Sequence, residues 1–160
     1  MKKFLGIAAV VFFSTFITIG CGKTKTAVDD NRQTKGRYFE TEYFTMFLAD
    51  GYTEMAVNGG VQAYKGNNFI EIHVRGLNQT EADIEASIKI LAKNYEGSDP
   101  EKTQLSGLSF LHSSIIAQGI PQDVYLAIMD GKKISITLSG KEHEKDEDLK
   151  VMFQSIKLKS

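Results

Sequence analysis

The sequence predicts an α+β fold, in which helices pack on an antiparallel β-sheet. Between residues 38 and 75, and again between 105 and 139, apolar stretches are separated by turn pairs such as Asp-Gly, Asn-Gly and Gly-Asn, which is typical of consecutive hairpins. Two amphipathic segments, at residues 80–95 and 149–156, have helical spacing instead. Hydrophobic residues make up 42% of the 160 residues, which is sufficient for a folded core.

The first 21 residues have the features of a secretion signal rather than of a fold element. Lys2 and Lys3 precede an uncharged, mostly apolar stretch at residues 4–20, and Cys21 follows Gly20 directly. A basic start, an apolar centre and a small residue before the cleavage point define a signal peptide. Cys21 is the only cysteine in the chain, and its position resembles the lipobox of bacterial lipoproteins.

This resemblance implies that residues 1–20 are removed as a signal peptide and that the Cys21 thiol receives a diacylglyceryl group. Two acyl chains, such as palmitate, are enough to hold a protein on a bilayer. We therefore expect a lipid-anchored lipoprotein of the cell membrane or the outer membrane, facing outside the cytoplasm. Two alternatives stay open: a transmembrane helix, although residues 4–20 are shorter than the roughly 20 residues needed to span, and a signal peptide in which Cys21 is incidental.

Residues 21–36 are predicted to be a flexible tether, and residues 37–160 a single α+β domain. The tether has no aromatic residue and no hydrophobic periodicity, so it cannot bury enough apolar surface to offset the entropy of ordering. Without the two signal lysines, 17 basic residues remain against 20 acidic ones. This slight acidic excess argues against a nucleic-acid partner, which requires a basic surface.

The first half of the domain is predicted to form strands. An aromatic and apolar run at residues 38–48 ends at the turn pair Asp50-Gly51, and strands are expected at residues 52–57, 61–65 and 68–75. The aromatic residues of this half either belong to the core or form an exposed patch for a partner: Tyr38, Phe39, Tyr43, Phe44, Tyr52 and Tyr64.

A helix is predicted at residues 80–95. Thr80 and Asp83 have the spacing of a capping box, and Ile84 and Ile88 lie on one apolar stripe. The helix is expected to end at the Gly97–Pro100 turn residues, before the next apolar stretch.

The second half returns to strands. A stretch at residues 105–118 is expected to break or bulge near Ser113-Ser114 and to end at Pro121. Asp130-Gly131 predicts a hairpin between strands at 124–129 and 133–139. The remaining elements are a charged loop, a short helix and an edge strand, at residues 141–148, 149–156 and 156–159.

This order of elements is similar to that of the PsbP-like superfamily, which includes photosystem accessory proteins, a Ran-binding nuclear import factor and DcrB-like bacterial envelope proteins. The resemblance covers residues 38–159 and includes the turn before an aromatic residue at Asp50-Gly51-Tyr52, the capped helix, and the closing segment Ser155-Ile156-Lys157-Leu158. It implies a sheet covered by helices and a non-enzymatic, protein-binding role. The superfamily shares no catalytic residues, so none is transferred to this chain.

No catalytic, cofactor-binding or metal site is predicted. Glu71 and His73 on one strand and His112 on another could hold zinc if the strands were adjacent, but the spacing of known zinc sites is missing. His143 stands among acidic residues that lack the spacing of a calcium loop, so we expect a solvated loop. Ser113 is adjacent to His112, but neighbours along a strand point to opposite faces and make no triad.

We therefore expect a non-catalytic module, attached to the membrane at Cys21, that binds an envelope protein or a ligand of unknown specificity. No cofactor and no nucleic acid are expected. The alternative is a small envelope enzyme or ligand carrier with a pocket between helix and sheet, using His73 or His112.

Overall fold

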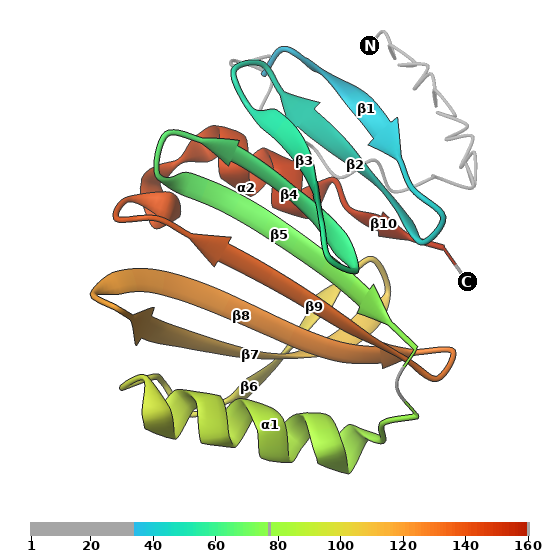
Figure 1. Ribbon diagram of the computed structural model, residues 1–160, viewed down its shortest axis with the longest axis vertical. Helices are drawn as coiled ribbons and strands as arrows, with labels where there is room; N and C mark the ends of the chain where they lie inside the picture. The colour runs from blue at the N-terminus through green and yellow to red at the C-terminus, as the bar shows by residue number, and fades with distance from the viewer. Residues whose placement is uncertain (1–33, 77, 160) are drawn as a thin grey trace, which may run out of the picture. The chain divides into compact units, whose positions relative to one another are not determined.

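The computed structural model describes residues 34–76 and 78–159, and in these ranges the strands form two antiparallel sheets (Figure 1). The larger sheet consists, in spatial order, of β3 (Thr53–Val57), β4 (Gly60–Lys65), β5 (Asn68–Arg75), β9 (Lys132–Ser139), β8 (Ile120–Met129), β7 (Leu108–Ala117) and β6 (Glu101–Leu105). The smaller consists of β1 (Gly36–Glu40), β2 (Phe44–Ala49) and β10 (Lys157–Leu158). The predicted signal peptide, Cys21 and residues 21–33 of the predicted tether lie outside the described ranges.

The chain passes from the smaller sheet to the larger one at a sharp corner. Asp50 and Gly51 form the predicted turn after β2, and Gly51 has a φ of 86°, which glycine adopts without steric strain. Tyr52 is buried at the corner, and β3 begins directly after it. Gly36, the last residue of the predicted tether, opens β1.

Helix α1 (Glu81–Asn94) confirms the predicted capping box. The Thr80 hydroxyl accepts from the Asp83 N–H, while the Asp83 carboxylate accepts from the Thr80 N–H, so both orphan donors are satisfied. Ile84 and Ile88 are buried against an apolar cluster that includes Val124 of β8. Figure 1 shows α1 lying along the end of the larger sheet that contains β7 and β8.

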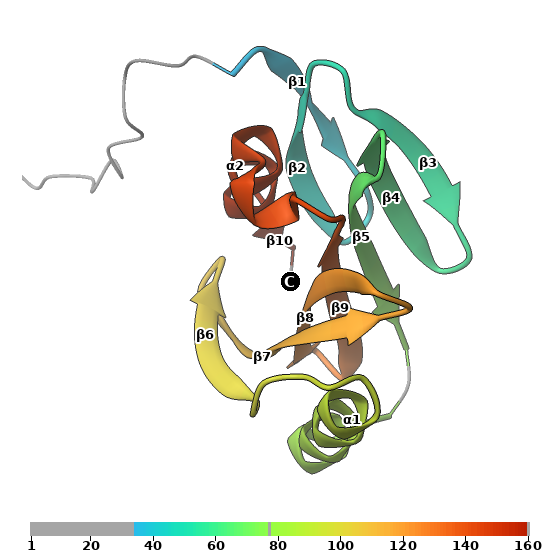
Figure 2. The same cartoon turned by 90° about the vertical axis from the view of Figure 1, so that its left-hand side faces the viewer.

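Helix α2 (Glu147–Gln154) packs on the opposite face of the larger sheet and on β2. Its Leu149 and Met152 join the main core, which includes Ile134 and Ile136 of β9 and Phe110 of β7. A short 3-10 turn, η1 (His143–Lys145), leads into this helix. Figure 2 shows the two helices far apart, with α2 beside β1 and β2 of the smaller sheet and α1 at the end of the structure near β7 and β8. Within the described residues, neither helix is long and apolar enough to cross a bilayer.

Two predictions for residues 100–121 are wrong. β7 runs without a break through Ser113 and Ser114, because Ser113 is buried and its hydroxyl donates to the Ser98 carbonyl at 2.8 Å. The break falls earlier, at the Ser106-Gly107 turn, and β6, which was not predicted, precedes it. Pro121 does not end a strand. It is the second residue of β8, close to the strand start, where a missing N–H is tolerated.

The predicted hairpin at Asp130-Gly131 is confirmed. Both residues have positive φ, 50° and 73°, which is the requirement of a type I′ turn. The pairs Ser106-Gly107 and Gln118-Gly119 have the same property. Three such turns join β6, β7, β8 and β9 into one continuous antiparallel meander.

Candidate functional site

The structure brings together two histidines and an aspartate that the sequence analysis did not connect. Asp123 of β8 lies opposite Ser114 of β7 in register, and His112 lies on the same face two residues along. His112 Nε2 is 3.0 Å from Asp123 Oδ1, and His143 Nε2, from η1, is 2.8 Å from Asp123 Oδ2. Ser114 also donates to Oδ1. We call these four residues the Asp123 cluster.

In each histidine of the cluster, both ring nitrogens lie within hydrogen-bond distance of an oxygen atom. His143 Nδ1 is 2.9 Å from the Gly140 carbonyl oxygen, and His112 Nδ1 is 3.3 Å from Glu101 Oε1. Because a neutral imidazole donates through one nitrogen only, the His112 ring can donate to both Asp123 and Glu101 only when it is protonated. The bond to Asp123 raises the pKa of His112 above its ordinary value, although burial acts in the opposite direction.

The central carboxylate is strongly biased towards its ionised form. Burial alone would raise the pKa of Asp123, but the hydrogen bonds from His112, Ser114 and His143 outweigh it and hold the pKa well below its usual range. His143 is only 3% exposed. The prediction that His143 lies in a solvated loop is therefore wrong, since its ring is buried against β8.

The arrangement does not match a catalytic triad, in which the histidine bridges the hydroxyl and the carboxylate. Here the carboxylate of Asp123 is central, and the Ser114 hydroxyl bonds to it directly. The ligand atoms of Asp123, His143 and Glu144 lie within 4.8 Å of one another, so these side chains could hold a metal ion. His112 contacts the other oxygen of Asp123 and does not belong to this group of ligand atoms.

A cavity of about 230 Å³ adjoins the cluster and is lined by Asp123, Tyr125, Leu138, His143, Glu144, Leu149, Lys150, Phe153 and Gln154. It is smaller than most small-molecule pockets, which hold about 300–1,000 Å³. The Tyr125 ring stacks on the His112 ring with 4.4 Å between the ring centres, and its centre lies 4.7 Å from that of Phe153. Tyr125 of β8 thus contacts both the cluster and α2.

Glu71, His73 and His112 are not brought together, so the strand adjacency that a zinc site from these residues requires is absent from the described residues. In register, His112 stands opposite Tyr125, Tyr125 opposite Ile136, and Ile136 opposite Ile72. His112 therefore shares a face with Ile72, whereas His73, the next residue along β5, points to the other face. The two histidines lie on opposite sides of the sheet, with β9 and β8 between their strands.

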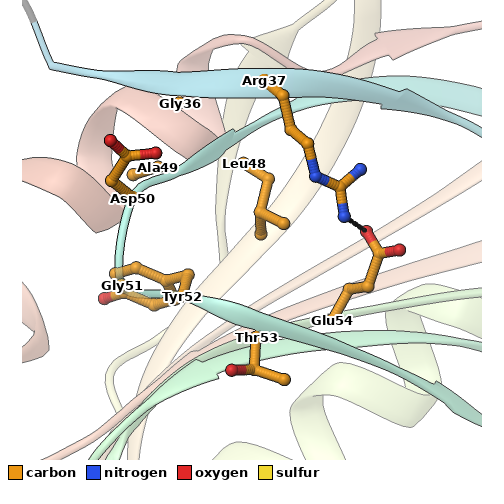
Figure 3. Close-up of a pocket in the computed structure, with 9 residues that line it drawn as sticks. All are labelled: Gly36, Arg37, Leu48, Ala49, Asp50, Gly51, Tyr52, Thr53 and Glu54. Carbon is orange, nitrogen blue, oxygen red and sulfur yellow. Dashed lines mark ion pairs between the residues drawn. The ribbon is translucent and has the colours of Figure 1, made fainter.

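A second candidate site is the groove where the two sheets meet. Figure 3 shows it between the end of β2, the start of β1 and the edge strand β3, with Leu48 on its inner side. Its volume is about 360 Å³, within the range of ligand pockets. Arg37 of β1 and Glu54 of β3 form an ion pair of 3.1 Å across it. We call this feature the sheet-junction groove.

The groove lies beside an unpaired backbone edge. β3 pairs with β4 and, among the described residues, with no strand on its other side. Residues of an antiparallel strand direct their N–H and C=O groups alternately to the two sides, so part of the β3 backbone faces solvent. Its side chains are exposed as well, with Met55 at 46%.

The aromatic residues of the first half divide between core and surface. Phe44 and Tyr52 are buried, whereas Tyr38 is 68% exposed and Tyr64 is 38% exposed. Tyr38 meets Phe47 edge to face at 5.4 Å. Tyr38 and Tyr64 thus belong to the surface, and the lipidation site predicted at Cys21 lies outside the described residues.

No protein-family model and no curated protein matches this sequence. The fold is similar to the solution structure of cyanobacterial PsbP (CyanoP) from Synechocystis sp. PCC 6803, with a TM-score of 0.54 and 10% identity over 83% of this chain and 98% of that one. A crystal structure from Bacteroides thetaiotaomicron VPI-5482 has a TM-score of 0.55 and 9% identity. That match covers 78% of this chain but 49% of the other, so this chain spans about half its length.

LpqN of Mycobacterium tuberculosis, described as involved in cell envelope biogenesis, has a TM-score of 0.46 and 15% identity over 78% of this chain and 86% of that one. It is too distant to support an argument. The match to CyanoP shows that this chain has a PsbP-like fold, with an antiparallel sheet and two helices packed on it. The predicted fold class is confirmed, and at these identities the likeness concerns the fold alone.

Proposed function

We propose that this chain is a lipid-anchored protein of the cell envelope that binds a partner protein without transforming it. The observation that carries the proposal is the sheet-junction groove, because it combines a cavity with the free edge of β3. An extended segment of a partner can add to such an edge as a further strand. Main-chain hydrogen bonds then supply affinity, and the adjoining cavity receives a side chain.

The groove can open to a partner at little cost. Both side chains of the Arg37–Glu54 ion pair that crosses the groove are exposed to solvent. Exposed ion pairs contribute only about 0–1 kcal/mol to stability. Below the pair, Leu48 and Tyr52 provide apolar surface, while Asp50 and Thr53 add polar groups. An extended peptide with one apolar side chain between polar neighbours fits this composition.

Site-specific photo-crosslinking on intact cells tests the partner. A crosslinking amino acid replaces Met55 on β3, and the control replaces Ile90, which is 60% exposed on α1. We expect the Met55 position to capture one consistent partner that the Ile90 position does not. The same random neighbours at both positions would refute the proposal.

A backbone variant separates strand addition from simple proximity. β3 and β4 are joined by a two-residue turn after Val57, which pairs with Gly60. The alternation of bonded and non-bonded pairs therefore points the Ala56 N–H away from β4. Ala56→Pro removes this donor and should abolish capture at Met55. Retained capture in a folded Ala56→Pro protein would exclude strand addition.

Anchoring at Cys21 is tested independently of the partner. The motivation is the signal-like sequence that ends at this only cysteine. Cells labelled with an alkyne fatty acid should incorporate label into the wild-type protein and not into Cys21→Ser. Equal labelling of the two proteins would show that the lipid is attached elsewhere.

A second candidate function is binding of a divalent metal ion at the Asp123 cluster. It is favoured by the converging ligand atoms of Asp123, His143 and Glu144, and by the contact of His143 Nδ1 with the Gly140 carbonyl, since metal-binding histidines are usually oriented in this way. Zinc should raise the melting temperature of the wild type and of Glu142→Gln, and raise that of Glu144→Gln less. An equal rise in all three would exclude this site.

A further inference from the structure

Among the described residues, a helix covers one part of one face of the larger sheet. α1 packs on β7 and β8, and the apolar residues of that face, such as Val124 and Leu126, lie beneath it. In register, Leu126 stands opposite Ser135 of β9, and Ser135 stands opposite His73 of β5. The same face therefore continues past α1 onto β9 and β5, where most of its residues are polar.

A small cavity of about 140 Å³ opens on this part of the face. It is lined by His73 and Arg75 of β5 and by Lys133 and Ser135 of β9, and we call it the basic cavity. The two strands are hydrogen-bonded neighbours, with His73 opposite Ser135 and Arg75 opposite Lys133. Four side chains from adjacent strands thus surround one space.

The two cations of the basic cavity face each other without an acidic partner. Like charges directly opposite on neighbouring strands destabilise a sheet. Among the described residues, no carboxylate lies within 4.0 Å of the Arg75 guanidinium or the Lys133 ammonium group. Arg75, Lys133 and Ser135 side chains make no hydrogen bond within the described protein either. Three of the four residues that line the basic cavity are therefore donors without an acceptor among the described residues.

Glu71, the acidic residue of β5 on this face, is already engaged. Glu71 accepts from Gln62 Nε2 at 2.8 Å through one oxygen and contacts His73 Nε2 through the other. The remaining ring nitrogen of His73, Nδ1, is buried and has no hydrogen-bond partner among the described residues. Glu71 is thus held on the side of β4, and it does not neutralise Arg75 and Lys133.

We propose that the basic cavity binds an oxyanion of the phosphoryl class. Arginine presents a planar fork that fits phosphate oxygens, lysine adds a point charge, and the Ser135 hydroxyl is a third donor. The cavity is much smaller than the roughly 300 Å³ at which pockets for whole ligands begin. It therefore accommodates one phosphoryl group, which is either a free phosphate or the headgroup phosphate of a membrane phospholipid. The site is independent of the sheet-junction groove and of Cys21.

Binding of inorganic phosphate, measured by isothermal titration calorimetry on the full chain, tests the site. Arg75→Gln and Lys133→Gln should each weaken binding at least tenfold. The matched control is Lys132→Gln, which removes the same charge one residue away, where the ammonium group lies 4.7 Å from the centre of the Tyr43 ring. Because alternate residues of a strand face opposite ways, this control should bind phosphate like the wild type.

A vesicle arm distinguishes the two sources of phosphate. The same four proteins are mixed with vesicles of phosphatidylglycerol or of phosphatidylcholine. For each protein, the amount bound to phosphatidylglycerol is divided by the amount bound to phosphatidylcholine, and the four ratios are compared. A phosphatidylglycerol preference that Arg75→Gln and Lys133→Gln lose, and Lys132→Gln keeps, assigns the site to lipid headgroups. Phosphate binding with no such preference assigns it to a free phosphate. The proposal is overturned if the wild type shows neither effect, or if Lys132→Gln weakens binding as much as the other two variants.

Discussion

Replacing Asp146 with alanine should destabilise this protein more than the loss of an ordinary helix cap. Asp146 precedes α2, and its Oδ1 accepts from the Leu149 N–H at 3.1 Å. Its Oδ2 accepts from the Tyr52 hydroxyl at 2.7 Å and from Asn68 Nδ2 at 2.8 Å. One carboxylate thus joins α2 to the corner before β3 and to the start of β5.

The magnitude follows from these three bonds. A lost cap costs about 1 kcal/mol, and hydrogen bonds to a charged group contribute about 1.5–3 kcal/mol each. Because Asp146 is only partly buried, we use the lower end of the range for each hydrogen bond. Asp146→Ala should then lower the free energy of unfolding by about 3–4 kcal/mol. Tyr52 is 6% exposed, so its hydroxyl cannot easily replace the lost acceptor with water.

Urea denaturation followed by circular dichroism measures this loss near neutral pH. The control is Thr80→Ala, which removes the cap of α1, where the capping bonds stay within the helix start, and should cost about 1 kcal/mol. The reasoning fails if Asp146→Ala is no more destabilising than Thr80→Ala. Tyr52→Phe, which removes only the hydroxyl, should account for part of the difference.

The contribution of Asp146 should also depend on pH. Burial alone would raise its pKa, but the bonds from Asn68, Tyr52 and the Leu149 N–H outweigh this and lower the pKa below the ordinary value. A depressed carboxyl pKa stabilises the fold above the unfolded pKa of about 3.9, and this stabilisation is lost as the pH falls through the folded pKa. The stability difference between wild type and Asp146→Ala should therefore shrink below about pH 4. A constant difference down to strongly acidic pH would contradict the assignment.

Three further substitutions test the packing and the Asp123 cluster. Ile136→Ala, in the fully buried core, should lower the free energy of unfolding by about 2–5 kcal/mol in urea, and a loss below about 1 kcal/mol would contradict this packing. Gly97→Ala should cost about 1–3 kcal/mol, because a Cβ there would lie 2.7 Å from Ile115 Cγ2, and an unchanged calorimetric melting temperature would show that this contact is absent. Asp123→Asn should cost about 1–3 kcal/mol, because the Asp123 carboxylate makes hydrogen-bond contacts with His112, Ser114 and the buried His143 ring, and wild-type stability in guanidinium would refute its role.

The parts of the fold that were predictable are those encoded in neighbouring residues. The β5 range was predicted to the residue, because its alternation is regular. The start of α1 was equally clear, since Thr80 and Asp83 satisfy each other locally. β6 was missed because only Leu105 of its five residues is buried, and pairing with β7, rather than any periodicity, makes it a strand. Ser106-Gly107 was missed because serine in a left-handed turn is a weaker signal than asparagine or aspartate.

The Asp123 cluster could not be assembled from sequence for a related reason. His143 stands in a run of charged residues, and this composition favours a solvated loop. Its burial depends on Asp123, twenty positions away, and on the carbonyl of Gly140. Asp123 itself fell just outside the predicted strand at 124–129, so its side chain had no assigned face. The register that places Asp123 opposite Ser114, two residues from His112 on the neighbouring strand, comes from the β7–β8 pairing and not from any local pattern.

The meander of β6 to β9 has a consequence for how the chain acquires its structure. Each of its three hairpins pairs segments adjacent in sequence, whereas β5 must wait for β9, which is synthesised only after α1 and three other strands. Contacts of short sequence separation close at low entropic cost, and distant ones close slowly. The β5–β9 pairing is therefore the late event of folding, and until it forms, two interior strand edges are open to pairing with another molecule.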